Sequence, residues 1–154
     1  MKRTLSAFVT MSACLLLAAE AYGHCEIPCG IYGDELRIKL LSEHVTTIEK
    51  SMKQISELSK QKSPNHNQIV RWVVNKEKHA EELQQIVSQY FLHQRIRPVD
   101  PKKDQKGYDA YVNQLVLLHK MLIYAMKAKQ SVDLEHIATL RSLLQAFERA
   151  YFKK

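Results

Sequence analysis

The residues best suited to chemistry in this chain of 154 residues lie close together near its N-terminus, in the stretch AYGHCEIPCGIYGD, residues 21–34. His24 and Cys25 are adjacent, and Cys29 follows within the same short segment. The chain has three cysteines, and the third, Cys14, lies inside an apolar run closer to the start. An imidazole, two thiols and the backbone nitrogens between them are potential ligands for a transition metal.

The ligand set becomes more specific if His24 is the first residue of the mature chain. Its α-amine, the amide nitrogen of Cys25 and the Cys25 thiolate can close fused chelate rings on one ion, and the Cys29 thiolate completes a plane. Square-planar coordination by nitrogen and sulfur favours Ni²⁺ or Cu²⁺ over Zn²⁺. The His24 imidazole remains as an axial ligand. Anionic donors stabilise a higher oxidation state, so the pattern indicates redox chemistry rather than hydrolysis.

A disulfide between Cys25 and Cys29 is the alternative interpretation, because two cysteines in an exported protein usually pair. Such a bridge would close a very small loop and would stabilise little of the remaining chain. The sequence has neither a C-x-x-C redox pair nor a C-x-x-C-H haem attachment motif. The residues alone leave the metal site and the disulfide open.

The start of the chain has the pattern of an export signal. Two basic residues precede an apolar run from Leu5 to Ala19, which is shorter than the roughly 20 residues of a membrane-spanning helix. Ala21 and Gly23 suit the small-residue positions of a signal peptidase site. We therefore expect residues 1–23 to be a cleaved signal peptide, with a retained membrane anchor as the alternative. Signal peptidase or a maturation protease would then make His24 the N-terminus of an exported protein, periplasmic or secreted.

The segment HCEIPCGIY, residues 24–32, resembles the N-terminal nickel hook of nickel-containing superoxide dismutases, whose pattern is H-C-x-x-P-C-G-x-Y. All of the fixed positions match, at the place where cleavage would generate an N-terminus. A weaker similarity continues in NKEKHAEE and QYF, residues 75–82 and 89–91. Subunits of this family are four-helix bundles that assemble as hexamers, so the resemblance implies a homohexamer.

The resemblance implies a dismutase that converts two superoxide ions and two protons into oxygen and hydrogen peroxide. Nickel, one ion per subunit, would cycle between the +2 and +3 states. Its ligands would be the His24 amine, the Cys25 amide and the Cys25 and Cys29 thiolates, with the His24 imidazole axial in the oxidised state. Tyr32 matches a tyrosine near the open face of the metal, where it would hold water or substrate and limit access. Without the motif, we would interpret Tyr32 as an aromatic residue that only packs against its neighbours.

Two positions depart from the family pattern. Many members have a Glu on the first helix and an Arg on the second that orient the axial imidazole. His79 lies at the position of the Arg, where an imidazole can still donate a hydrogen bond, although a plain surface role is the alternative. Lys39 is nearest to the position of the Glu, with Glu35 and Glu43 as candidate substitutes. Glu26 is a milder change from an Asp.

The remaining histidines have no metal-binding spacing and we expect them on the surface or in the core: His44, His66, His93, His119 and His136.

Four amphipathic helices must position the hook, which we define as residues 24–33. Apolar residues recur in steps of three and four over about 34–61, from a helix start at Ser63 and Pro64 to Phe91, over about 108–129, and from Leu134 to Tyr151. The segment 96–107, with two prolines and a glycine, predicts the longest loop. Four apolar stripes favour an all-α, antiparallel four-helix bundle over residues 34–154. The expected core positions are Ile38, Leu41, Val45, Ile48, Met52, Ile55, Ile69, Val73, Ala80, Leu83, Val87, Tyr90, Phe91, Val112, Leu115, Leu118, Leu122, Ala125, Leu134, Ile137, Leu140, Leu144, Phe147 and Tyr151.

Basic residues outnumber acidic ones, 23 Lys and Arg against 16 Asp and Glu, for a net charge of +7. They are spread along the chain, so we expect no nucleic-acid partner and, after cleavage, no membrane partner. A positive net charge would attract a small anion, although solvated helix faces explain the same pattern. Beside the dismutase, the second hypothesis is a non-enzymatic exported four-helix bundle protein that carries nickel or copper on the same N-terminal ligands.

Overall fold

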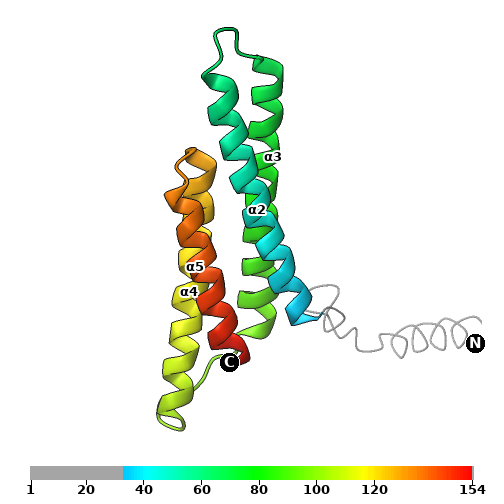
Figure 1. Cartoon of the computed structure of the whole chain (residues 1–154). Helices are drawn as coiled ribbons and strands as arrows, with labels where there is room; N and C mark the ends of the chain where they lie inside the picture. The colour runs from blue at the N-terminus through cyan, green and yellow to red at the C-terminus, as the bar shows by residue number, and fades with distance from the viewer. Residues whose placement is uncertain (1–32, 154) are drawn as a thin grey trace, which may run out of the picture.

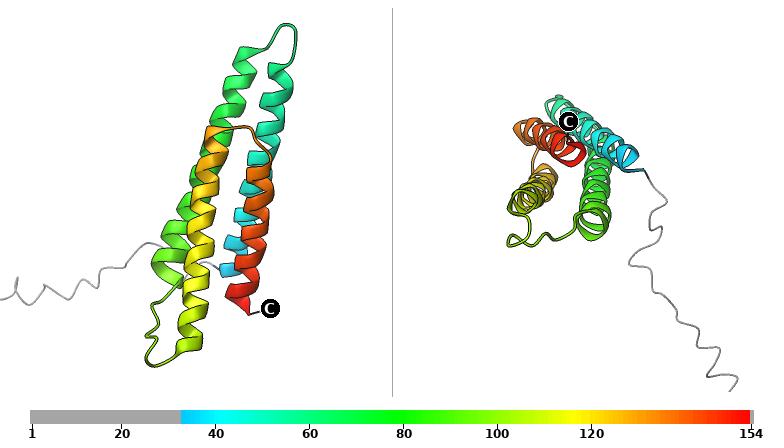
Figure 2. Two further views of the ribbon diagram at one scale, coloured as in Figure 1. Left: turned by 90° about the vertical axis from the view of Figure 1, so that its left-hand side faces the viewer. Right: turned by 90° about the horizontal axis from the view of Figure 1, so that it is seen from below.

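The computed structural model of the chain describes residues 33–153, which form an antiparallel four-helix bundle (Figure 1). Its elements are α2 (Asp34–Ser59), α3 (His66–Gln85) with its π-helical continuation η1 (Ile86–Arg95), α4 (Gln105–Gln130) and α5 (Glu135–Phe152). Within these residues no strand occurs. The right-hand view of Figure 2 shows the helices from below, grouped side by side, and their buried residues form one core cluster. The predicted fold class, an all-α antiparallel four-helix bundle, is confirmed.

Two of the helices begin with an Asx side chain that accepts a backbone hydrogen bond. Asn65 caps α3 by accepting from the N–H of Gln68 at 3.1 Å. The expected start of this helix at Ser63 and Pro64 is therefore wrong, because the amide of Asn65 supplies the cap. Asp104 caps α4 by accepting from the N–H of Gly107 at 2.8 Å. A Cβ at position 107 would lie 2.2 Å from the Asp104 carboxylate, which explains a glycine inside this helix.

The core forms along the predicted stripes, most completely on α2. All six expected α2 positions are buried. The predictions of core positions at Val73 and Leu134 are wrong, because these side chains are 36% and 41% exposed. Val73 lies near the start of α3, and the α2–α3 hairpin extends past the turn between α4 and α5 (Figure 1). Val73 lies three residues before Lys76, whose ammonium reaches the carbonyls at the end of α4, so little of α4 remains to cover it. Leu134 precedes α5, in the turn that follows α4.

The second helix was expected to remain α-helical through Phe91, but Ile86–Arg95 is π-helical. The N–H of Ile96 donates to the carbonyl of Phe91 at 2.9 Å, five residues back, which is the π-helical spacing. Phe91 is fully buried and meets the ring of Phe147 on α5 at 5.0 Å between centroids. Its neighbour Tyr90 is also buried and reaches the start of α2 instead.

None of the helices in residues 33–153 is both long enough and apolar enough to cross a bilayer.

Candidate metal centre and its supports

The predicted metal ligands lie outside the described residues. His24, Cys25, Cys29 and Tyr32 all precede Gly33, where the description begins. These assignments stay predictions. The structure does describe the part of the bundle to which the hook is joined, at Gly33 and the first turn of α2.

Asp34, the first residue of α2, is held by three other side chains. Its Oδ1 accepts hydrogen bonds from the Tyr90 hydroxyl at 2.6 Å and from Nε of Arg95 at 2.9 Å. Its Oδ2 accepts from the Tyr151 hydroxyl at 2.7 Å. Tyr90 and Arg95 come from η1 and Tyr151 from α5. Three elements therefore meet at the residue directly after the hook.

The electrostatics of this cluster favour an ionised Asp34. Burial alone would raise the pKa of the Asp34 carboxyl, but the hydrogen bonds from Tyr90 and Tyr151 and the charge of Arg95 together bring that pKa below its ordinary value. Conversely, burial and the hydrogen bond to Asp34 raise the pKa of Tyr151, so its hydroxyl stays protonated and donates. The Arg37 and Arg95 guanidiniums also lie 5.1 and 4.6 Å from the Tyr90 ring centroid, within reach of a cation–π interaction.

His79 faces another helix instead of projecting from the bundle. Its Nδ1 lies 2.9 Å from Nδ1 of His44 on α2. Oε2 of Glu82, one turn along α3, lies 3.3 Å from the His79 nitrogen and 3.5 Å from the His44 nitrogen. All three side chains are half-buried. Burial lowers the pKa of His44, and the charge of His79 lowers it further, against the opposing effect of Glu82 and Glu43.

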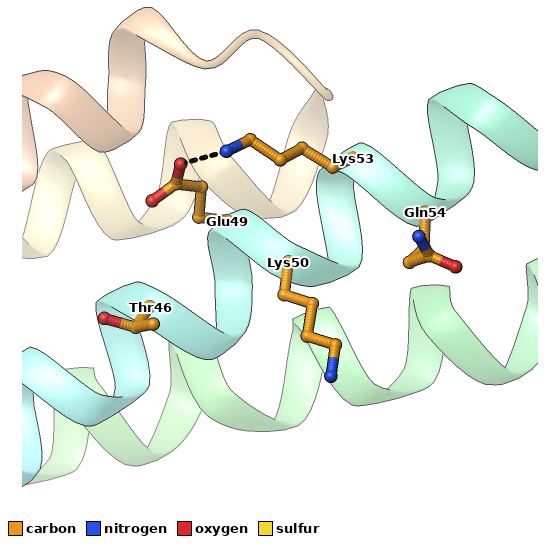
Figure 3. Close-up of a pocket in the computed structure, with 5 residues that line it drawn as sticks. All are labelled: Thr46, Glu49, Lys50, Lys53 and Gln54. Atoms are coloured by element: carbon orange, nitrogen blue, oxygen red, sulfur yellow. Dashed lines mark hydrogen bonds and ion pairs between the residues drawn. The ribbon is translucent and has the colours of Figure 1, made fainter.

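A hollow of about 330 Å³ on α2 offers no comparable set of ligands. Figure 3 shows that its lining side chains all come from one helix and that Lys50 points away from the Glu49–Lys53 ion pair. Glu49 also pairs with Arg141 of α5. With its carboxylate engaged by two cations and no thiol or imidazole in its wall, this hollow has no ligands for a soft metal. Its lining residues are Thr46, Glu49, Lys50, Lys53 and Gln54.

The family model for nickel-containing superoxide dismutase matches residues 18–154, which is most of the chain. The chain belongs to the nickel-containing superoxide dismutases. It is therefore an oxidoreductase that acts on superoxide and uses a nickel cofactor. Comparison with curated proteins and with solved structures gave no match.

The donors predicted for the hook of this nickel-containing superoxide dismutase are of the types that suit the family's metal. Two thiols with adjacent nitrogen donors suit Ni²⁺. Among the described residues, the Asp34 carboxylate at the start of α2 accepts hydrogen bonds from η1 and α5. In this dismutase the start of α2 is thus tied to both of those elements.

The sequence analysis did not predict that His44 and Glu82 lie beside His79. His44 was expected on the surface or in the core because it has no metal-binding spacing, and Glu82 was not considered. A histidine and a glutamate three residues apart on α3 were a usable signal, because such residues share a helix face. His44 gave no such signal, since it is 35 residues from His79. The candidate carboxylates Glu35 and Glu43 are both exposed, and Glu82 is the carboxylate that approaches His79.

Proposed function

We propose that this dismutase matures by cleavage after Gly23 and holds its nickel at the new N-terminus. The α-amine of His24, the amide of Cys25 and the thiolates of Cys25 and Cys29 would hold the ion, with the His24 imidazole as a further ligand. Only cleavage converts the His24 nitrogen from an amide into an amine with a free lone pair. The observation that carries the proposal is the family match, which begins at residue 18 and so includes the hook sequence.

Bound to these donors, nickel would supply a one-electron couple between the +2 and +3 states. Two superoxide ions and two protons then become one molecule of oxygen and one of hydrogen peroxide, so that one superoxide ion is oxidised and the other reduced. The anionic thiolates of Cys25 and Cys29, together with the deprotonated amide, favour the higher oxidation state.

The remaining residues of the hook would control access. We assign to the Tyr32 hydroxyl the task of holding water or substrate beside the metal and of excluding larger molecules from the thiolates. Thiolates are open to irreversible oxidation, so restricted access protects the ligands as well as selecting the substrate. Removal of Lys2, Arg3 and Glu20 with residues 1–23 leaves the mature chain with a net charge of +6, which attracts the superoxide anion over a longer range.

The proposal extends to assembly and location. We assign residues 1–23 to an export signal and the mature chain to the periplasm or the exterior of the cell. We further propose a homohexamer, as in the family that the hook resembles. Its support among the described residues is an apolar surface on α3, where Val70 and Val74 are 59% and 60% exposed.

The ligand set is tested by one alanine placed before His24 in the mature chain. The added residue turns the His24 amine into an amide, and we expect superoxide turnover to fall to background with loss of bound nickel. The matched control adds one alanine after Lys154, far from the hook in sequence, and should retain full turnover. Full activity of the N-terminally extended protein would disprove the proposed ligand set.

A further inference from the structure

His44, His79 and Glu82 bring three potential metal ligands together without using any residue of the hook. Their ligand atoms are 2.9, 3.3 and 3.5 Å apart. Atoms bound about 2.05 Å from a tetrahedral Zn²⁺ are separated by about 3.3 Å. The three observed separations lie on both sides of this value, so an ion could be bound with small side-chain movements.

Hydrogen bonding satisfies this cluster poorly. A neutral imidazole carries only one N–H, and a carboxylate carries none. If only one of the two Nδ1 atoms carries a proton, that N–H can donate either to the other imidazole or to Glu82. The acceptor that is not chosen then keeps a lone pair without a donor. If both carry protons, two donors face each other at 2.9 Å. One cation would accept all three lone pairs together.

The surroundings of the cluster suit an ion that is partly shielded from water. The side chains of His44, His79 and Glu82 are 13%, 25% and 36% exposed. Lys78 approaches the other oxygen of Glu82, Oε1, at 3.8 Å. Oε2 is therefore left to the two histidines, and the partial exposure leaves room for water in a further position.

The cluster lies well inside α2 and not at its first turn. His44 is ten residues beyond Asp34, which at a rise of 1.5 Å per residue places it about 15 Å along the helix axis from the first residue of α2. His44 comes from α2, while His79 and Glu82 come from α3. An ion bound there would therefore cross-link these two helices.

We propose that His44, His79 and Glu82 form a second metal site, which binds one divalent ion of the zinc class and ties α2 to α3. Two imidazoles and one carboxylate, with a further position open to water, are an established ligand set for zinc. The proposal does not depend on the ligands assigned to the hook.

The test is a titration of the nickel-loaded mature protein with Zn²⁺, followed by desalting and measurement of both metals by mass spectrometry. We expect one zinc ion per chain in addition to unchanged nickel. His44→Ala and His79→Ala should each weaken zinc binding by more than the roughly 100-fold that loss of an outer partner costs. Glu82→Gln, which keeps the shape but removes the charge, should weaken it as well. Circular dichroism of each variant establishes that the helices are intact.

Two controls separate this site from the hook. His119→Ala removes an exposed histidine of α4 and should leave zinc binding unchanged. Cys25→Ser combined with Cys29→Ser should abolish nickel binding and retain the zinc ion. The proposal is overturned if the nickel-loaded protein takes up no zinc, if zinc is lost with the two cysteines, or if His79→Ala alters superoxide turnover while zinc affinity stays the same. That last outcome would assign His79 to the hook.

Discussion

Asp34 shows how a single residue can fix the start of α2 to two other elements. Its carboxylate accepts hydrogen bonds from Tyr90, Tyr151 and Arg95, and it lies in the first turn of α2, where a negative charge also complements the helix dipole. Aspartate at a helix start is easily explained by that dipole alone. Only the folded chain reveals the two tyrosines and the arginine that converge on it.

We expect Asp34→Asn to lower the free energy of unfolding at neutral pH by about 1–2 kcal/mol, because a charged acceptor of three hydrogen bonds becomes a neutral one that is still partly exposed. Chemical denaturation monitored by circular dichroism measures this change. Asp109→Asn is the control: Asp109 is exposed on α4 and accepts from Gln105, and its replacement should change stability by less than about 0.5 kcal/mol.

The same variant makes a prediction about pH. The pKa of Asp34 in the folded protein lies below its ordinary value of 3.8, so the stabilisation is fully present above the unfolded pKa and is lost as pH falls through the folded pKa. The difference in stability between the parent protein and Asp34→Asn should be constant above about pH 5 and shrink as pH falls below 4. A difference that widens in acid would contradict this account.

At the scale of elements, Lys76 joins α3 to the end of α4. It is 4% exposed, and its ammonium donates to the carbonyls of Lys129 and, at 3.0 Å, Ser131. The last carbonyls of a helix have no partner within the helix, and a cation there complements the dipole. Burial lowers the pKa of Lys76, partly offset by Glu77 at 3.7 Å. A buried lysine on an otherwise amphipathic helix thus has a structural explanation.

We expect Lys76→Met to destabilise the bundle by about 1–3 kcal/mol, because two partly buried carbonyls lose their donor while the volume of the side chain is kept. Thermal and chemical unfolding of the metal-loaded protein measure the change. The matched control on the same helix is Lys78→Met, whose side chain is 69% exposed. Equal or higher stability of Lys76→Met would mean that the desolvation of the ammonium outweighs its hydrogen bonds.

At the scale of the whole molecule, the bundle is not equally thick along its length. The α2–α3 hairpin extends past the α4–α5 turn (Figure 1). The exposed Val70 and Val74 precede Lys76 on α3, and the Lys76 ammonium reaches the end of α4. Exposed apolar side chains that gather on one face of a helix mark a candidate interaction surface. We therefore assign this face to contacts between subunits in the proposed homohexamer.

We expect Val70→Lys combined with Val74→Lys to shift the protein to smaller species, since burying each valine contributes roughly 1.5–3 kcal/mol and a buried lysine is costly. Sedimentation velocity gives the masses. Val116→Lys, at a valine of α4 that is 43% exposed, is the control and should leave the mass unchanged. An unaltered mass for the double variant would place the subunit contacts elsewhere.

Local sequence patterns predicted most of the fold and the candidate hook. The proposed nickel ligands come from three residues within a segment of six, so their spacing requires no knowledge of tertiary contacts. The stripe on α2 likewise follows from helical periodicity, and all six of its expected core residues are buried. Family membership and the four-helix bundle agree with these predictions, while the ligand roles of His24, Cys25 and Cys29 stay predictions.

Contacts between helices were decided only by the tertiary structure. His44 meets His79 because of the rotation and register of α2 against α3, and neither quantity is encoded in the period of a single stripe. Asp34 meets Tyr151 across 117 positions of sequence. Val73 fits its apolar stripe yet is exposed, because burial depends on how far the neighbouring helices extend. Periodicity determines which face of a helix is apolar, whereas the packing of whole helices determines what that face, and the polar residues beside it, will contact.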